Sequence, residues 1–479
     1  MKILHTSDWH LGRTLYGRKR HEEFDAFLDW LAATVAAQQV EALLIAGDVF
    51  DTSTPGNRAQ AQYYRFLHRI AALPGCRHVV VVAGNHDSPT FLDAPAALLA
   101  ALDVHVIGQA RANPADELLL LRNAQGQPGL LVCAVPYLRS SDLRSAEAGE
   151  SLHEKEQKLR EGVHAHYAAV AEHALAQRAA LLAQGGPLVP IVAMGHLYAE
   201  GGSVQACEGE GVRDLYVGSL GRVDASVFSP AFDYVALGHL HVPQSVGGVR
   251  TIRYSGSPLP MGFGEAGQAK SVCLVQWAAP ASHADVPAHA PASSAESAAG
   301  GLSASVTENA TAPERIELLP VPVFQPLERV GGDWPAIASR LAQLAQADAE
   351  VLACAASAGV AGEAREASEA NAPNAPPGAW LEVVYEGAEL MPDLRARLDE
   401  AVAGTRLQVL RVKNTRLSAQ ALAHSAQALE LEPQELDARE VFERCLEAHA
   451  IVDGQRQPLR QAYDEILHAL QEEDGRADA

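Results

Sequence analysis

The chain has 479 residues, of which 48% are hydrophobic, and a formal net charge of −22 at pH 7. This length predicts about three domains, and no apolar run of about 18 residues is present that would predict a membrane span. The acidity counts against a general affinity for nucleic acid, which comes mainly from neutralised phosphates, although a metal centre or a local basic strip can override the net charge. The six cysteines form no CxxC pair, which argues against a disulfide framework and indicates a reducing cytoplasm.

Residues 1–277 alternate apolar runs with amphipathic helical stretches, the pattern of a layered α/β domain. Helices are expected at 21–37 and 57–72, and a long polar helical insertion at about 150–184. The strand-like runs are ALLIAG (42–47), HVVVVAG (78–84), LLVCAV (130–135), PIVAMG (190–195) and YVALG (234–238).

A smaller α+β unit is expected after a linker. Residues 278–313 are rich in Ala, Ser, Pro and Gly, a composition that cannot form a core. The unit spans 314–416 in the order β-α-β-α-β, with strands expected at 316–323, 380–386 and 407–412 and helices at 334–347 and 393–403. A disordered-like insertion interrupts it at about 355–379, and acidic amphipathic helices follow at 429–472.

Five of the expected strands are followed by side chains that can bind a metal. In four cases the first such side chain comes directly after a glycine, which allows a tight turn and a close backbone approach. These side chains are Asp8 and His10, Asp48, Asn85 and His86, His196, and His239 and His241. Functional groups in open α/β sheets collect at the carboxyl ends of strands, so we expect them at one edge. Singly, each also fits a turn former or a cap; their joint occurrence favours a site.

The expected site holds two metal ions. Carboxylates, an amide oxygen and imidazoles together suit borderline divalent metals such as Mn, Fe or Zn. Seven ligands are too many for one mononuclear site, and they fit two ions that share a carboxylate, as used for phosphoester displacement. Asp48 is the expected bridge, because it is a lone carboxylate after its strand.

The motifs DWHLG, GDVFD, GNHD, GHLY and GHLH, in this order, resemble the calcineurin-like metallophosphoesterases. The longer strings KILHTSDWHLGRTLYGRKRHEEF, AGDVFDTSTP and YVALGHLHVPQ, followed by RYSGSPLPMGFGE, are similar to the SbcD family of bacterial DNA repair nucleases, counterparts of the Mre–Rad type. The resemblance covers residues 1–277 closely. It implies a four-layer α/β fold, with two packed β-sheets flanked by helices, to which 314–416 adds a capping or DNA-binding domain.

The resemblance also implies roles for single residues. One metal would be held by Asp8, His10, Asp48 and His241, and the other by Asp48, Asn85, His196 and His239; the expected ion is Mn²⁺. His86 would stabilise the transition state or protonate the leaving oxygen. Asp51 is expected to orient His86, as a carboxylate fixes a catalytic imidazole. Asp87 receives no role beyond a loop or supporting residue.

The implied activity is ATP-dependent double-strand DNA exonuclease and hairpin or single-strand endonuclease cleavage, which would process double-strand breaks and replication-associated hairpins at the nucleoid in the cytoplasm. An SbcC-like ATPase is the implied partner in a heterotetramer-type complex, and the chain itself has no G-x-x-x-x-G-K-[ST] motif. The resemblance further suggests a homodimer through the nuclease domain, with helices near 57–72 and 89–101 as candidates. The helices at 429–472 would dock on the partner.

A basic loop after the first ligand pair is the expected DNA contact, although an ordinary charged loop is the alternative. Its members are Arg13, Arg18, Lys19 and Arg20. A second candidate is Arg411, Lys413 and Arg416 at the end of the second unit. Surface positions are expected for the histidines of the helical insertion, His153, His164, His166 and His173.

Two other functions remain open from the sequence. The same metal fold also serves phosphatases that act on small molecules or proteins, because fold alone does not fix the substrate. A non-catalytic scaffold at DNA ends is the second alternative, and the intact set of metal ligands argues against it.

Overall fold

The structure is a computed structural model that describes residues 1–143, 151–199, 223–278, 311–359, 377–387, 391 and 393–414, with the single positions 456, 460 and 463. The predicted linker, apart from its ends, most of the insertion at 355–379 and nearly all of the helices at 429–472 lie outside the described residues, as does Arg416. None of the described helices combines the length and the apolar character that a bilayer span requires.

The first sheet has six strands in the order β14-β13-β1-β4-β5-β6. Its strands are β1 (Lys2–Thr6), β4 (Ala42–Ala46), β5 (His78–Val82), β6 (Val104–Ile107), β13 (Ser271–Gln276) and β14 (Arg315–Pro320). β1, β4, β5 and β6 run parallel, whereas β13 and β14 are antiparallel to their neighbours. Every residue of β4 and β5 is buried, as expected for parallel strands covered on both faces.

The second sheet also has six strands, in the order β11-β12-β10-β9-β8-β7. Its strands are β7 (Leu118–Arg122), β8 (Pro128–Ala134), β9 (Ile191–His196), β10 (Tyr234–Gly238), β11 (Gln244–Val246) and β12 (Val249–Tyr254). β8, β9, β10 and β12 are parallel, and the edge strands β7 and β11 are antiparallel. The strands predicted at 130–135, 190–195 and 234–238 are β8, β9 and β10, three of the four inner strands of this sheet.

The first unit has four layers, with an apolar core between each pair of neighbouring layers. One core fills the space between the two sheets, with Val80 of β5 and Val192 of β9 among its members. A second joins the first sheet to α1 (His21–Ala37) and α2 (Asn57–Ala71), and a third joins the second sheet to α6 (Leu152–Ala183). This arrangement confirms the predicted four-layer fold. It also shows that α6 is the crossover from β8 to β9 and one of the four layers, not an addition to the fold.

Short helices complete the first unit. They are α3 (Pro89–Asp93), α4 (Ala96–Ala100), α5 (Ser140–Leu143) and the 3₁₀ turns η1 (Pro114–Glu117), η3 (Ala225–Val227) and η4 (Phe263–Glu265). The helix expected near 89–101 is therefore two short helices, α3 and α4. Pro95 stands at the N-cap of α4, because proline has no backbone N–H to continue the preceding helix.

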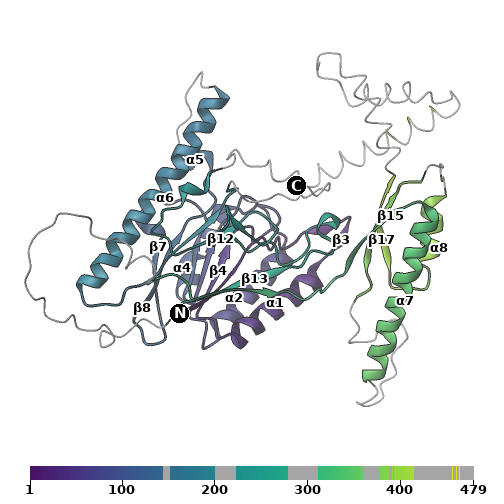
Figure 1. The fold of residues 1–479 in the computed structure, drawn as a ribbon, viewed down its shortest axis with the longest axis horizontal. Helices are drawn as coiled ribbons and strands as arrows, with labels where there is room; N and C mark the ends of the chain where they lie inside the picture. Colours follow the sequence, from purple (N-terminus) through teal and green to yellow (C-terminus); the bar gives the residue numbers. More distant parts are fainter. Residues whose placement is uncertain are drawn as a thin grey trace, which may run out of the picture.

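The second unit is a parallel sheet in the order β15-β16-β17, covered by two helices, and it lies at the opposite end of the molecule from α6 (Figure 1). Its elements are β15 (Leu327–Gly332), α7 (Trp334–Gly359), β16 (Trp380–Tyr385), α8 (Leu394–Ala401) and β17 (Gln408–Asn414). The predicted β-α-β-α-β order is present, but its first strand is β15. The strand predicted at 316–323 is instead β14, which pairs with β13 in the first sheet.

Two boundaries of the second unit were therefore wrong. The first unit extends to Pro320, because β14 adds an edge strand across the predicted linker. α7 continues to Gly359, beyond the predicted end at 347 and into the predicted insertion. The alanine-rich sequence of this stretch was interpreted as loop composition, but alanine is the best helix former and sustains the helix.

The two units meet at a small apolar contact. Leu15 and Phe263 of the first unit pack with Leu327 at the start of β15. Tyr16 stacks on Phe263 with ring centroids 5.7 Å apart, and the guanidinium of Arg411 from β17 lies 4.8 Å from the centre of the Tyr16 ring. The second unit therefore rests on the loops that follow β1 and β12.

Candidate metal centre

The predicted metal-binding side chains converge at the carboxyl ends of strands from both sheets. β1, β4 and β5 of the first sheet deliver the side chains from Asp8 to His86, and β9 and β10 of the second deliver His196, His239 and His241. The sequence predicted one sheet edge, whereas the site lies where the edges of two packed sheets meet. The glycines before the ligands are needed there, because a Cβ at Gly47 would collide with the His196 ring and one at Gly84 with Asp48.

Asp48 lies between the two halves of the site. Its Oδ2 is 3.2 Å from Nε2 of His196 and 3.8 Å from Nε2 of His10, and the side chain is almost fully buried. Burial opposes its ionisation, but the imidazoles of His196 and His10 hold the pKa of this carboxyl well below its usual range. A buried carboxylate between two imidazoles matches the bridging position expected for Asp48.

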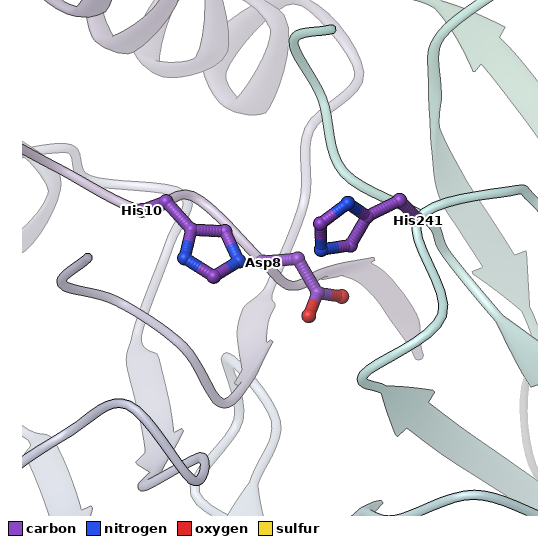
Figure 2. Close-up of side chains that lie close together, drawn as sticks. All are labelled: Asp8, His10 and His241. Atoms are coloured by element: carbon purple, nitrogen blue, oxygen red, sulfur yellow. The ribbon is translucent and has the colours of Figure 1, made fainter. Parts of the chain in front are cut away.

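Asp8, His10 and His241 form the first half of the site, and their metal-binding atoms lie within 4.8 Å of one another (Figure 2). Trp9 separates the first two and turns the other way, into the core against Phe27, while its Nε1 donates to Thr6. This anchor fixes the backbone so that the side chains on either side of Trp9 face the site.

Asn85, His196 and His239 form the second half. Nδ1 of His196 donates to the backbone oxygen of Ala46 at 2.9 Å, so in the neutral ring Nε2 carries the lone pair. That nitrogen lies 3.1 Å from Oδ1 of Asn85, which is also 3.1 Å from Nδ1 of His239. The hydrogen bond to the carbonyl thus selects the tautomer that a metal-binding imidazole needs.

The donor set fits cations. Among the residues that the structure describes, neither ring nitrogen of the buried His10 has a hydrogen-bond partner. Nε2 of His196 faces the oxygens of Asp48 and Asn85, so a positive charge is needed among them. A proton meets this need in the metal-free chain: burial lowers the pKa of His196, but the Asp48 carboxylate outweighs it and raises this pKa to about 9. Carboxylate, amide and imidazole donors can hold two divalent metals here.

His86 stands beside the two halves and is partly exposed. Its ring centroid is 4.9 Å from that of His10, and its backbone N–H donates to Oδ1 of Asp48 at 2.9 Å. Nδ1 donates to the backbone oxygen of Asp51 at 2.7 Å. Asp51 thus contacts His86 as expected, but through its backbone oxygen and not through its carboxylate. The carboxylate accepts from Arg13 at 3.0 Å and lies 3.4 Å from Nδ1 of His10.

Asp87, which the sequence left without a role, is buried and ties two loops of the site together. Its carboxylate accepts hydrogen bonds from the backbone N–H groups of Val49 and Phe50, after β4, and of Gly84, after β5. These bonds are 2.9–3.1 Å long. Asp87 therefore holds the segments that carry Asp48 and Asn85 in one arrangement.

Glu265 and Lys270 are functional candidates that sequence reasoning did not identify. Oε1 of Glu265 accepts from Nδ1 of His241 at 2.9 Å, and its Oε2 accepts from Nζ of Lys270 at 2.5 Å. Burial opposes the ionisation of Glu265, but Lys270 and His241 hold the pKa of this carboxyl well below its usual range. The only sequence signal was that Glu265 ends the family-like string RYSGSPLPMGFGE.

The structure buries one residue of the predicted basic loop and exposes two others. Arg20 is buried and forms a bidentate pair with Glu23 at 2.7 and 2.9 Å, so it is withdrawn from solvent and its expected DNA contact is wrong. Arg13 donates to Asp51 and to the backbone oxygen of Met261. The exposed positions are Arg18 and Lys19, on the hairpin of β2 (Thr14–Leu15) and β3 (Arg18–Lys19).

Other predicted surface residues also have partners. Arg411 and Lys413 both approach the buried carboxylate of Glu382, at 3.5 and 3.1 Å. Three of the insertion histidines are exposed, namely His153, His164 and His173. His166 is not, because its Nε2 lies 2.8 Å from the fully buried carboxylate of Glu117. The surface prediction is therefore wrong for His166.

Comparison with known proteins agrees with this architecture. Residues 1–243 match the family model described as calcineurin-like phosphoesterase, and residues 323–450 match the SbcD C-terminal model described as type 5 capsule protein repressor C-terminal domain. The fold and the site therefore define a calcineurin-like metallophosphoesterase.

The similarity to curated proteins extends over the whole chain. The chain is 33% identical to the D subunit of the nuclease SbcCD from Escherichia coli K12 over 470 residues, 98% of each chain. It is 38% identical over 292 residues to the protein of that name from Rhodobacter capsulatus, a match that covers 60% of this chain and 69% of the relative. It is 37% identical over 279 residues to the protein from Bacillus subtilis, a match that covers 57% of this chain and 66% of the relative. The chain belongs to the SbcD family of nuclease subunits.

Proposed function

We propose that this chain is the nuclease subunit of an SbcCD-type complex and hydrolyses DNA phosphodiester bonds with two divalent cations, Mn²⁺ being the expected ion. The observation that carries the proposal is the convergence of seven donor side chains from five strands, with His86 beside them. The seven are Asp8, His10, Asp48, Asn85, His196, His239 and His241. A scaffold that only binds DNA ends would not need this set intact.

The protein's own groups have distinct roles in this proposal. When bound, two such cations would neutralise phosphate charge and lower the pKa of a water molecule. Asp48 is placed to be shared between them, since its Oδ2 faces ligands of both halves. Because Nδ1 of His86 donates to the Asp51 carbonyl, the proton for the leaving oxygen would come from its Nε2. The endonuclease activity of the family, which cleaves hairpins and single strands, would use the same residues as the exonuclease activity.

Partners follow from the family and from the surface. The relatives are named as subunits of a complex, and we propose that an SbcC-like ATPase binds the segment 429–472 and supplies the ATP dependence. Arg18 and Lys19, exposed on the hairpin after β1, are the proposed phosphate contacts. For the proposed homodimer the support is the exposed apolar surface of the α4 segment, where Leu98 is 73% and Leu102 46% exposed. The cytoplasm, at the nucleoid, is the proposed place of action.

The test is cleavage of linear duplex and hairpin-ended DNA with Mn²⁺ and ATP, after co-purification with the ATPase partner. His86→Gln should abolish cleavage, because glutamine cannot transfer a proton, and should leave metal and DNA binding within about threefold. His173→Gln, on the exposed face of α6, is the matched control and should cleave normally. Turnover of a generic phosphomonoester without any DNA cleavage would instead show a phosphatase.

A further inference from the structure

A buried acid–base pair lies behind His241. Glu265 is 9% and Lys270 5% exposed, and the carboxylate joins the two, with Oε1 on Nδ1 of His241 and Oε2 on the lysine ammonium. Lys270 also donates to Oγ of Ser257 at 3.0 Å and to the backbone oxygen of His241 at 3.3 Å. The imidazole and its own carbonyl are therefore held by one network.

His196 of the second half and His241 of the first are oriented by different groups. His196 donates to a neutral carbonyl, that of Ala46, whereas His241 donates to an ionised carboxylate. A carboxylate behind a metal-binding imidazole fixes its tautomer and raises its basicity, and loss of such a partner weakens metal affinity. The Glu265 contact therefore acts on the half formed by Asp8, His10 and His241.

We propose that Glu265 is a positioning residue that holds His241 with its proton on Nδ1, and thereby sets the affinity of one of the two metal sites, while Lys270 fixes the orientation of Glu265. This inference rests on the proposed two-metal function. It makes the two sites separable: the pair controls the site of Asp8, His10 and His241, and the site of Asn85, His196 and His239 does not depend on it.

The surroundings of Glu265 predict what its amide analogue does. Oε2 accepts from Lys270 and from the backbone N–H of Met261 at 3.1 Å, so an amide in this place must put its oxygen there. η4, which carries Glu265, is held by the stacking of Phe263 on Tyr16. In Glu265→Gln the amide NH₂ would then face Nδ1–H of His241, donor against donor. His241 relieves this conflict by moving its proton to Nε2, which removes the lone pair offered to the metal.

The experiment is a Mn²⁺ titration of the metal-free full-length protein, with free Mn²⁺ followed by electron paramagnetic resonance. The wild type should bind two ions. Glu265→Gln should weaken one site about 10- to 100-fold and leave the other within about threefold. Gln268→Ala is the matched control, because Gln268 approaches the same ammonium at 3.4 Å, whereas Lys270 keeps its shorter bond to Glu265 without it. Its two sites should match those of the wild type.

Two further measurements keep the test decisive. Nitrogen-15 spectra of labelled histidines in the metal-free protein should show His241 changing from the Nδ1–H to the Nε2–H tautomer in Glu265→Gln. Lys270→Met, which keeps the carboxylate and loses its anchor, should weaken the same site by about three- to tenfold and serves where the glutamine variant does not fold. Unchanged affinities, or equal weakening of both sites, would overturn the inference. A wild type that binds fewer than two ions would instead refute the proposed function.

Discussion

Removal of the Asp87 carboxylate should destabilise the first unit by several kcal/mol. In Asp87→Ala, the backbone N–H groups of Val49, Phe50 and Gly84 lose their acceptor in a buried place. Each unsatisfied buried donor costs about 1–3 kcal/mol. Three of them give roughly 3–9 kcal/mol, and water entering the space left by the carboxylate brings the expected loss to about 3–5 kcal/mol.

Asp87→Asn separates hydrogen bonding from simple loss of volume. Its amide oxygen can still accept, but its NH₂ must face at least one of the three N–H groups, so we expect a loss of about 1–3 kcal/mol. The assay is urea unfolding of the metal-free protein, in which the midpoint should fall while the slope stays constant. Asp29→Ala is the control, since Asp29 is 71% exposed in its ion pair with Arg69 and should change stability by less than about 0.5 kcal/mol. An Asp87→Ala variant whose free energy of unfolding stays within about 1 kcal/mol of the wild type would refute this reasoning.

Two further predictions concern charge. Arg20→Ala should lower the free energy of unfolding by about 3–5 kcal/mol, because it leaves Glu23 buried without its partner. The double change Arg18→Ala with Lys19→Ala should leave the free energy of unfolding unchanged within about 0.5 kcal/mol. It should also reduce the salt dependence of DNA binding by the equivalent of about one to two phosphate contacts. Urea unfolding and DNA binding at several salt concentrations measure these effects. An Arg20→Ala variant of unchanged stability, together with a double variant that is destabilised and binds DNA as the wild type does, would contradict the assignment of Arg20 to the core and of Arg18 and Lys19 to DNA. Saturation with Mn²⁺ at about 100 times its dissociation constant should stabilise the chain by about 2.7 kcal/mol per site, which thermal unfolding with and without chelator measures; an unchanged midpoint would argue against metal binding.

Most of the first unit could be predicted from the sequence because its signals are local. Runs such as VVVV before Gly84 are typical of buried parallel strands, and the structure places β5 there. The ligand side chains could be predicted as a set for the same reason, since each follows its strand within a few residues. The structure brings them together, and the metal-binding role itself stays a prediction.

The remaining features depend on contacts between distant residues. β14 carries ordinary strand signals, but nothing in its sequence says that it joins β13 across the linker. Arg20 is charged like its neighbours, and only the fold shows that it is buried against Glu23. Glu265 lies 24 residues beyond His241, and the contact arises because the chain after β12 returns to the site.

Backbone conformation at the ligands is a further property that the sequence does not reveal. Asp8, His10 and Asp48 have φ values of 54°, 48° and 49°, and His239 has a φ of 106°. Residues other than glycine rarely adopt these positive φ values, which cost roughly 1–3 kcal/mol per residue. Such strain persists only where the surroundings fix the backbone. The ligands are therefore held by the fold in directions that an isolated loop would not keep.

The contacts that fix this backbone link the loops of the site in series. The loop after β10 joins the loop after β1, because the backbone N–H of His239 donates to the Asp8 carboxylate at 3.0 Å. The loop after β1 joins the loop after β4, because the N–H of His10 donates to the Asp48 carbonyl at 3.0 Å. Asp87 joins the loop after β4 to the loop after β5. Each loop is thus held by a neighbour rather than by the metal. Because Asp87 makes the last link of the series, its loss should loosen the loop after β5, which carries Asn85 and His86, from the loop after β4, which carries Asp48.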